Sequence, residues 1–224
     1  MRIVQCWDDG VVDDVRLIEI LRRHGAKASF NLNLGTQPAE RQAGWVYRGV
    51  KEVWKLGKGD LREVYAGFTI ANHSATHPKL QEIPPERAAE DIRRGRELLE
   101  QHFGCAVTGF AYPFGTHSAA VREAVCAAGH VYARTTQAVD CAFPPADAMA
   151  FNPNCHVAVA DFWERVERVR GQPDGVFYFW GHSYELISEA DWQAMAEKIA
   201  RLSAYPDAVW CDLPALFAPP GNAA

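Results

Sequence analysis

The chain has 224 residues, with 23 Lys and Arg against 28 Asp and Glu, which gives a formal net charge of −5. This length suits one α/β barrel domain with a sizeable interior. The charges are scattered and form no basic stripe, which argues against nucleic acid or an anionic membrane as the main partner. No apolar run approaches the length of a membrane span, and we find no internal repeat.

The cysteines and the first residues bear on the cellular compartment. Six cysteines lie far apart without a C-x-x-C pair, which argues against a structural zinc site and a redox motif. We expect reduced, mostly buried thiols. Met1 and Arg2 lead directly into the apolar run 3–7, which leaves no room for a signal peptide. The sequence as given therefore predicts a cytoplasmic protein.

Strand and helix patterns alternate from the start of the chain. The apolar run 3–7 predicts a buried parallel strand, and the apolar spacing over residues 15–21 predicts a helix that ends at Gly25. Residues 27–34 predict the next strand. Strand, helix and strand in this order are the unit of a parallel sheet.

The same alternation continues to residue 211. Residues 35–59 are irregular, and an aromatic hairpin around Trp45 and Trp54 is one interpretation. Asp60-x-x-Glu63 has the form of a capping box and predicts a short helix that Gly67 closes. Six further strands are predicted, at residues 68–71, 107–112, 131–133, 149–151, 175–181 and 208–211. Helices are predicted at residues 84–103, 118–128, 161–170, capped by Asp161, and 189–202.

These elements predict a barrel. A regular eight-unit (β/α) barrel usually needs about 250 residues. We therefore expect an α/β fold that is a distorted (β/α) barrel with seven or eight parallel strands. The predicted domain covers residues 1–218, and residues 219–224 are expected to be a disordered tail.

Two histidines, His73 and His77, follow the strand pattern at residues 68–71. On one turn of helix their spacing would place both imidazoles on the same face, close enough to share a metal ion, and Pro78 should end that turn. Asp8 and Asp9, at the end of the first strand, supply carboxylates. Two His and one carboxylate leave open positions on a zinc-like ion, which is typical of a catalytic site.

Polar residues recur where predicted strands end. Active sites of (β/α) barrels lie at the C-terminal ends of the strands. Side chains that bind metals or protons occur there at Asp8, Asp9, His73, His77, Tyr112, Arg134, His156 and His182. Neighbouring carboxylates in an extended strand point oppositely, so the first two can serve one ion and its water only if the chain turns at Gly10.

Four motifs resemble the pattern of polysaccharide deacetylases (NodB homology, carbohydrate esterase family 4). They are Trp7-Asp8-Asp9-Gly10, His73-x-x-x-His77-Pro78, Tyr112-Pro113-Phe114-Gly115 and Gly181-His182. That family has a distorted, often seven-stranded barrel and removes N- or O-linked acetyl groups from sugars with a divalent metal. The resemblance implies a metal site at Asp9, His73 and His77, a general base at Asp8, a general acid at His182, and an oxyanion donor at the Phe114 backbone N–H. Zinc is the first expectation for the ion, with nickel, cobalt or iron as alternatives.

The third motif departs from the family pattern. Ala111 stands where the family usually has an Arg that orients the catalytic Asp. Arg134, at the end of the next strand, could reach the same space and keep Asp8 ionised, with a structural salt bridge as the alternative. Weaker candidates for contacts with a sugar are His156 and the aromatic residues Tyr112, Trp180 and Tyr184, because aromatics at strand ends more often belong to the core.

The predicted function is metal-dependent removal of an acetyl group, N-acetyl above all, from a sugar or oligosaccharide. Two alternatives stay open: a hydrolase of a non-sugar amide on the same fold, and a carbohydrate-binding relict with weak catalysis. The missing motif Arg favours the relict. The presence of both Asp, both His and His182 argues against it, because binding alone requires neither a base nor an acid.

Overall fold

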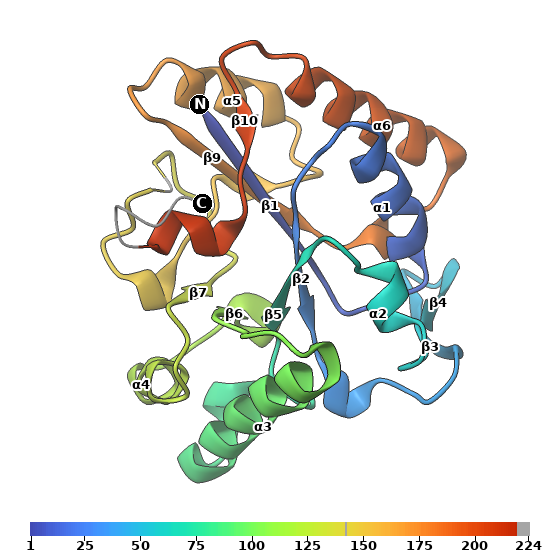
Figure 1. Ribbon diagram of the computed structural model, residues 1–224, viewed down its shortest axis with the longest axis vertical. Coiled ribbons are helices and arrows are strands. Elements are labelled where there is room, and N and C mark those ends of the chain that lie inside the picture. Colours follow the sequence, from blue (N-terminus) through green and yellow to red (C-terminus); the bar gives the residue numbers. More distant parts are fainter. Residues whose placement is uncertain (142, 219–224) are drawn as a thin grey trace.

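The computed structural model describes residues 1–141 and 143–218, so the tail predicted at residues 219–224 lies outside the described part. Eight strands form one curled parallel sheet in the order β7-β6-β5-β2-β1-β9-β8, with β10 beside β1. The helices lie around the outside of this sheet (Figure 1). The predicted distorted barrel is confirmed.

The element bounds follow the predicted alternation closely. The strands of the sheet are β1 (Arg2–Asp8), β2 (Ser29–Leu32), β5 (Thr69–Asn72), β6 (Gly109–Ala111), β7 (Tyr132–Arg134), β8 (Cys155–His156), β9 (Val176–Gly181) and β10 (Val209–Trp210). The helices are α1 (Asp13–Arg23), α2 (Leu61–Val64), α3 (Pro85–Phe103), α4 (Ala119–Ala127), α5 (Phe162–Arg170) and α6 (Glu189–Ser203). Among the described residues, no helix combines the length and the apolar character that crossing a membrane requires.

β1 is the central strand of the sheet. One of its edges pairs with β9 over residues 2–7. Its other edge is shared, because β10 pairs with residues 2 and 3 and β2 pairs with residues 6–8. Because β10 and β2 pair with different parts of the same edge of β1, they diverge there, and the barrel is distorted at this place.

The strand predicted at residues 149–151 is wrong. Ala148–Ala150 form a 3₁₀ turn, and only Phe151 pairs with β7, where its N–H donates to the Ala133 carbonyl at 2.8 Å. The chain then crosses to β9, where the Asn154 N–H donates to the Tyr178 carbonyl at 2.7 Å. This short connection links the two ends of the sheet.

Alternate residues of the strands face the barrel interior, as the pleat requires. In β1, Ile3 and Trp7 pack under the outer helices, whereas Val4 and Cys6 pack inside the barrel. The next residue of the inner row is Asp8. The inner rows of β9 and β7 end in the same way, at Trp180 and Arg134. The strand pleat therefore delivers polar and aromatic groups to one end of the interior.

The aromatic hairpin is present as β3 (Gln42–Tyr47) and β4 (Lys51–Lys55), which pair antiparallel. It lies against the connection between β1 and α1. The Val12 N–H donates to the Trp54 carbonyl at 2.8 Å, and Lys55 pairs with Val11 in an isolated bridge. The end of β4 is therefore fixed beside the end of β1.

Two predicted helix caps are wrong, because an Arg takes the carboxylate in each case. Asp60 precedes α2 but binds Arg41, with Nε 2.9 Å from Oδ2, and makes no side-chain cap. Asp161 likewise binds Arg165 at 2.9 Å.

The expectation of mostly buried thiols is also wrong. All six cysteines are free, but Cys105, Cys126 and Cys141 are exposed and only Cys6 and Cys155 are buried. The exposed three lie outside the strands, in helix α4 or in loops, so the apolar patterns that predicted the strands did not include them.

Candidate active site

The two adjacent carboxylates reach one cavity because the backbone turns sharply after β1. Asp9 has φ 84° and Gly10 has φ 67°, so the turn predicted at Gly10 begins one residue earlier. A positive φ is unfavourable for Asp and marks a residue held by its surroundings. As a result, Asp8 Oδ2 and Asp9 Oδ1 both lie 3.9 Å from His73 Nε2.

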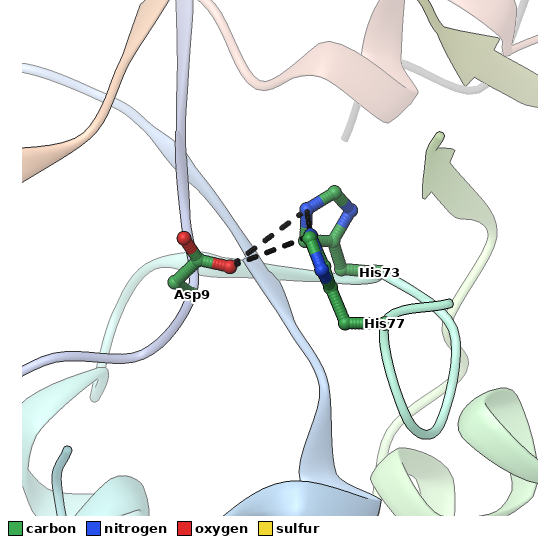
Figure 2. A group of neighbouring side chains, drawn as sticks. All are labelled: Asp9, His73 and His77. Atoms are coloured by element: carbon green, nitrogen blue, oxygen red, sulfur yellow. Dashed lines mark hydrogen bonds and ion pairs between the residues drawn. The ribbon is translucent and has the colours of Figure 1, made fainter. Parts of the chain in front are cut away.

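The histidine pair lies on a loop after β5, so the predicted helical turn is wrong. Ser74 and His77 have φ of 61° and 57°, and the carboxylate of Asp91, on α3, accepts two backbone N–H groups of the loop at 3.0 and 3.1 Å. The imidazoles still meet, with their Nε2 atoms 3.1 Å apart. His77 Nε2 lies 3.8 Å from Asp9 Oδ1, and Figure 2 shows this carboxylate pointing toward both rings.

This donor set fits a divalent metal ion. His73 Nδ1 lies 2.7 Å from the Ala111 carbonyl oxygen, so Nδ1 carries the proton and Nε2 is free to bind. Ligand atoms 3.1–3.9 Å apart are compatible with bonds of about 2.0–2.2 Å to one ion. Burial lowers the pKa of both histidines, that of His77 to about 4, and a metal requires neutral imidazoles.

Asp8 is buried and held from two sides. Arg134 Nη2 donates to its Oδ2, and Asn31 Nδ2 donates to its Oδ1 at 2.6 Å. Burial raises the pKa of Asp8, but the charges of Arg134, His73 and His182 outweigh burial and hold this pKa well below its usual range. Asp8 is therefore ionised and oriented.

Arg134 contacts Asp8 from the strand next to the one that carries Ala111. Ala111 and Arg134 are register partners in β6 and β7, so the guanidinium starts one strand away from the motif position. Its Cζ lies 4.7 Å from the centre of the Trp180 ring. Trp180 thus packs on this cation.

His182 faces the two carboxylates from the end of β9. Its Nε2 lies 3.7 Å from Asp8 Oδ2 and 3.9 Å from Asp9 Oδ2, while its Nδ1 lies 3.3 Å from Glu185 Oε1. Burial lowers the pKa of His182, but Glu185 and the two aspartates outweigh burial, so this pKa is raised. Sequence reasoning missed Glu185, and its spacing three residues after His182 was the available signal.

His156 contacts the other oxygen of Glu185, with Nε2 2.8 Å from Oε2. The Ala158 N–H donates to His156 Nδ1 at 3.2 Å, so the ring proton is on Nε2. His156, Glu185 and His182 are close enough to bind a metal ion, but a protonated Nε2 donates a hydrogen bond instead. We therefore interpret Glu185 as a carboxylate that lies between two imidazoles, 2.8 Å from His156 Nε2 and 3.3 Å from His182 Nδ1.

These groups surround a cavity of about 410 Å³. Every site residue predicted from the sequence lines it except His156, which lies behind Glu185. The lining residues are Asp8, Asp9, His73, His77, Tyr112, Phe114, Gly115, Arg134, Thr136, Trp180, His182 and Tyr184. Thr136 and Gly115 were not predicted from the sequence.

Phe114, whose backbone N–H is the candidate oxyanion donor, lines this cavity beside aromatic side chains that already have partners in the protein. Phe114 has φ 59°, its side chain is exposed, and the N–H of the following Gly115 is used by the Tyr112 carbonyl at 2.9 Å. Gly115 therefore cannot be the oxyanion donor, whereas Phe114 remains the candidate.

The Tyr112 hydroxyl donates to the Met149 carbonyl at 2.8 Å, and the Tyr184 ring packs on the β3–β4 hairpin.

Strand β2 and the residue after its end supply two amides, at Asn31 and Asn33, that the sequence did not single out. Asn31 binds Asp8, and Asn33 Nδ2 lies 3.4 Å from Asp9 Oδ1. Their spacing was the available signal, because Asn31 and Asn33 stand two residues apart in the predicted strand, alternate with apolar residues and would therefore point to the same side.

A (β/α) barrel whose strand ends carry paired carboxylates and three histidines defines a class of hydrolytic sites. The profile of the polysaccharide deacetylase family matches residues 1–133, more than half of the chain, and the chain belongs to this family. The matched region includes both carboxylates and the histidine pair; Arg134, His182 and Glu185 lie beyond it. No curated protein sequence matches the chain significantly.

Solved structures share the fold. The peptidoglycan deacetylase PdaC from Bacillus subtilis is 16% identical, with 96% of this chain and 88% of that chain covered and a TM-score of 0.58. The family 4 carbohydrate esterase from Streptomyces lividans, in complex with acetate, is 16% identical, with 89% and 86% covered and a TM-score of 0.56. The deacetylase PplD from Streptococcus pyogenes, also with acetate, is 19% identical with a TM-score of 0.50; the match covers 59% of this chain and only 55% of that chain.

Proposed function

We propose that this protein is a divalent-metal-dependent deacetylase that hydrolyses the N-acetyl group of an acetylated sugar or oligosaccharide. Family membership implies the deacetylation of acetylated carbohydrate. The observation that carries the finer proposal is the approach of Asp9, His73 and His77 within 3.9 Å of one another, next to a second, separately held carboxylate.

Asp9, His73 and His77 would hold the ion. Two imidazoles and one carboxylate favour zinc, with nickel, cobalt or iron as alternatives. When bound, such an ion polarises the acyl oxygen and lowers the pKa of a water molecule.

Asp8 is the proposed general base. Its Oδ1 accepts the Asn31 amide and its Oδ2 accepts Arg134, so the carboxylate cannot rotate freely. It takes one proton from the water that attacks the acyl carbon. Arg134 keeps it ionised for this step, and the Phe114 N–H is the proposed donor to the oxyanion.

His182 is the proposed general acid. Its Nε2 faces the cavity, and Glu185 on the Nδ1 side stabilises the protonated ring. When the carbon–nitrogen bond breaks, Nε2 gives its proton to the leaving amine, and acetate is the second product. A carbohydrate-binding relict without catalysis would not need the contacts of Glu185 and the aspartates with His182. The missing Arg at position 111 favours the relict, but Arg134 is proposed to supply that positive charge instead.

Acetate release from a panel of N- and O-acetylated sugars, with an N-acetyl amino acid as the non-sugar amide, tests the proposal. We expect release from sugars, loss after chelation, and recovery on addition of zinc. Asp8→Asn should retain the metal, because Asp9 is the ligand, and should lose about 10²–10⁴-fold in turnover. Release that survives chelation, or that occurs from the non-sugar amide alone, would contradict the proposal.

A further inference from the structure

A second cavity, of about 360 Å³, adjoins the first. The two share Asp9, His77, Phe114 and Tyr184 in their walls, so they form one continuous space around the proposed metal ligands. The second cavity extends between the hairpin β3–β4 and the loop after β2. A substrate whose acetyl group lies in the first cavity can therefore place a neighbouring group in the second.

The position of Lys55 in this second cavity is fixed by the backbone. Lys55 is the last residue of β4 and pairs with Val11, two residues after Asp9. The next residue, Leu56, donates its N–H to the Gly10 carbonyl at 3.2 Å. The root of the Lys55 side chain is therefore held at a constant place relative to the proposed metal ligands.

Lys55 is half-buried but has only a neutral partner. Its Nζ donates to the Thr36 hydroxyl at 2.8 Å; burial lowers the pKa of Lys55 more than the charge of Asp9 raises it, and no ion pair with Lys55 is formed among the described residues. Lys51, on the same strand, shows the contrast, because it donates to Asp13 at 2.6 Å. A desolvated cation without a direct ion pair is costly, and an anionic ligand would supply that pair.

The other walls of this cavity have the chemistry of a sugar site. Trp45 offers an indole, its ring centre 5.2 Å from that of Tyr184, and Asn33 and Thr36 offer an amide and a hydroxyl. Aromatic faces with a few polar groups are typical of sites that orient small polar ligands. Lys55 is the only Lys or Arg among the residues that line this cavity.

We propose that the second cavity binds an anionic group, a carboxylate or a phosphate, and that Lys55 makes acidic sugars the preferred substrates. This inference rests on the proposed function, since it names the substrate class of the same site. An ammonium group paired with an anion at short distance gives a charge-assisted hydrogen bond, which a neutral sugar cannot replace.

The test compares sugars that differ only in one anionic group. The neutral parent is N-acetylglucosamine, and the charged probes are its 1-phosphate, its 6-phosphate and its 6-carboxylate, so the set also separates phosphate from carboxylate. We expect at least one charged probe to exceed the parent in kcat/KM by about 10- to 100-fold. Lys55→Met should raise KM for the charged probe and so remove its preference over the neutral sugar, and Lys55→Glu should disfavour the charged probe further.

Lys58→Met is the matched control, because Lys58 is exposed and does not line the cavity. Calorimetric binding of the deacetylated probes, glucosamine and its phosphates, supplies a readout that does not need catalysis. If no sugar releases acetate but Lys55 still controls the binding of the charged products, the proposed function fails and the anionic site stands. If no charged probe is preferred in either assay, or if the preference survives in Lys55→Met, the inference is overturned.

Discussion

The site has two halves that are built differently. The half proposed to bind the metal, with Asp9, His73 and His77, lies in the region that matches the family and uses short motifs with left-handed residues. The half proposed to transfer protons takes Arg134 and His182 as single residues from strand ends beyond that region. A metal site needs fixed distances between ligands, which a rigid local backbone supplies. A charge that only has to lie near Asp8, such as the guanidinium of Arg134, can come from a neighbouring strand.

Removal of the ligands should break the first half completely. In a His73→Ala, His77→Ala double variant only Asp9 remains as a ligand, so we expect the stoichiometric metal ion and acetate release to be lost together. Elemental analysis of the purified protein measures the metal. An unchanged metal content would show that the ion binds elsewhere and would remove the basis for the division into halves.

Removal of His182 should lower the rate of hydrolysis by an amount that depends on the leaving group. His182→Ala should lower amide hydrolysis by about 10²–10⁴-fold, because a departing amine needs a proton. An activated ester leaves without one, so its hydrolysis should largely survive. Steady-state rates on both substrates make the comparison, with metal content as the control. Equal losses on amide and ester would mean that His182 binds substrate and is not the acid.

Arg134 sharpens the comparison because it contacts the proposed base Asp8 and none of the proposed metal ligands. Arg134→Met should lower kcat by roughly tenfold to a hundredfold, since Asp8 loses a charge-assisted hydrogen bond, and should leave the metal content unchanged. Circular dichroism and thermal unfolding confirm that the variant is folded. Unaltered kinetics would reduce Arg134 to a structural ion pair, the alternative that the sequence left open.

One further effect is expected on stability and not on turnover. Asp14, on α1, is buried and accepts hydrogen bonds from Ser183, next to His182, and from Tyr65, both at 2.6 Å. Burial raises its pKa to about 7. Between about pH 4 and pH 7 the unfolded carboxyl is ionised while the folded one keeps its proton, so stability falls as pH rises.

Urea unfolding of wild type and Asp14→Asn across this range measures the effect. The amide mimics the protonated acid, so the free energy of unfolding of wild type should fall relative to the variant by about 1.4 kcal/mol per pH unit. A difference that does not change with pH would show that Asp14 is ionised in the folded protein.

The sequence predicted the barrel and the strand ends because strand patterns and pleat are local properties. Asp8, Arg134 and His182 could be placed at one rim for that reason. The loop of the histidine pair could not be predicted, because its conformation depends on Asp91, which lies on the following helix.

Contacts between distant segments escaped the sequence for the same reason. Lys55 reaches the cavity only through the register between β4 and Val11, and no motif indicates this register. The incorrect cap at Asp60 has the same cause, because the competing Arg41 lies 19 residues earlier in the chain.

The position of β1 has a kinetic consequence. The strand is synthesised long before its partner β9, which spans Val176–Gly181, and before β10. The edge of β1 that pairs with β9 therefore stays unpaired on the ribosome until residues 176–181 have been made. Such distant pairing slows folding and exposes intermediates to aggregation. We expect refolding from urea to be slow and to improve at low protein concentration, and Asp8 to meet His182 only in its last phase.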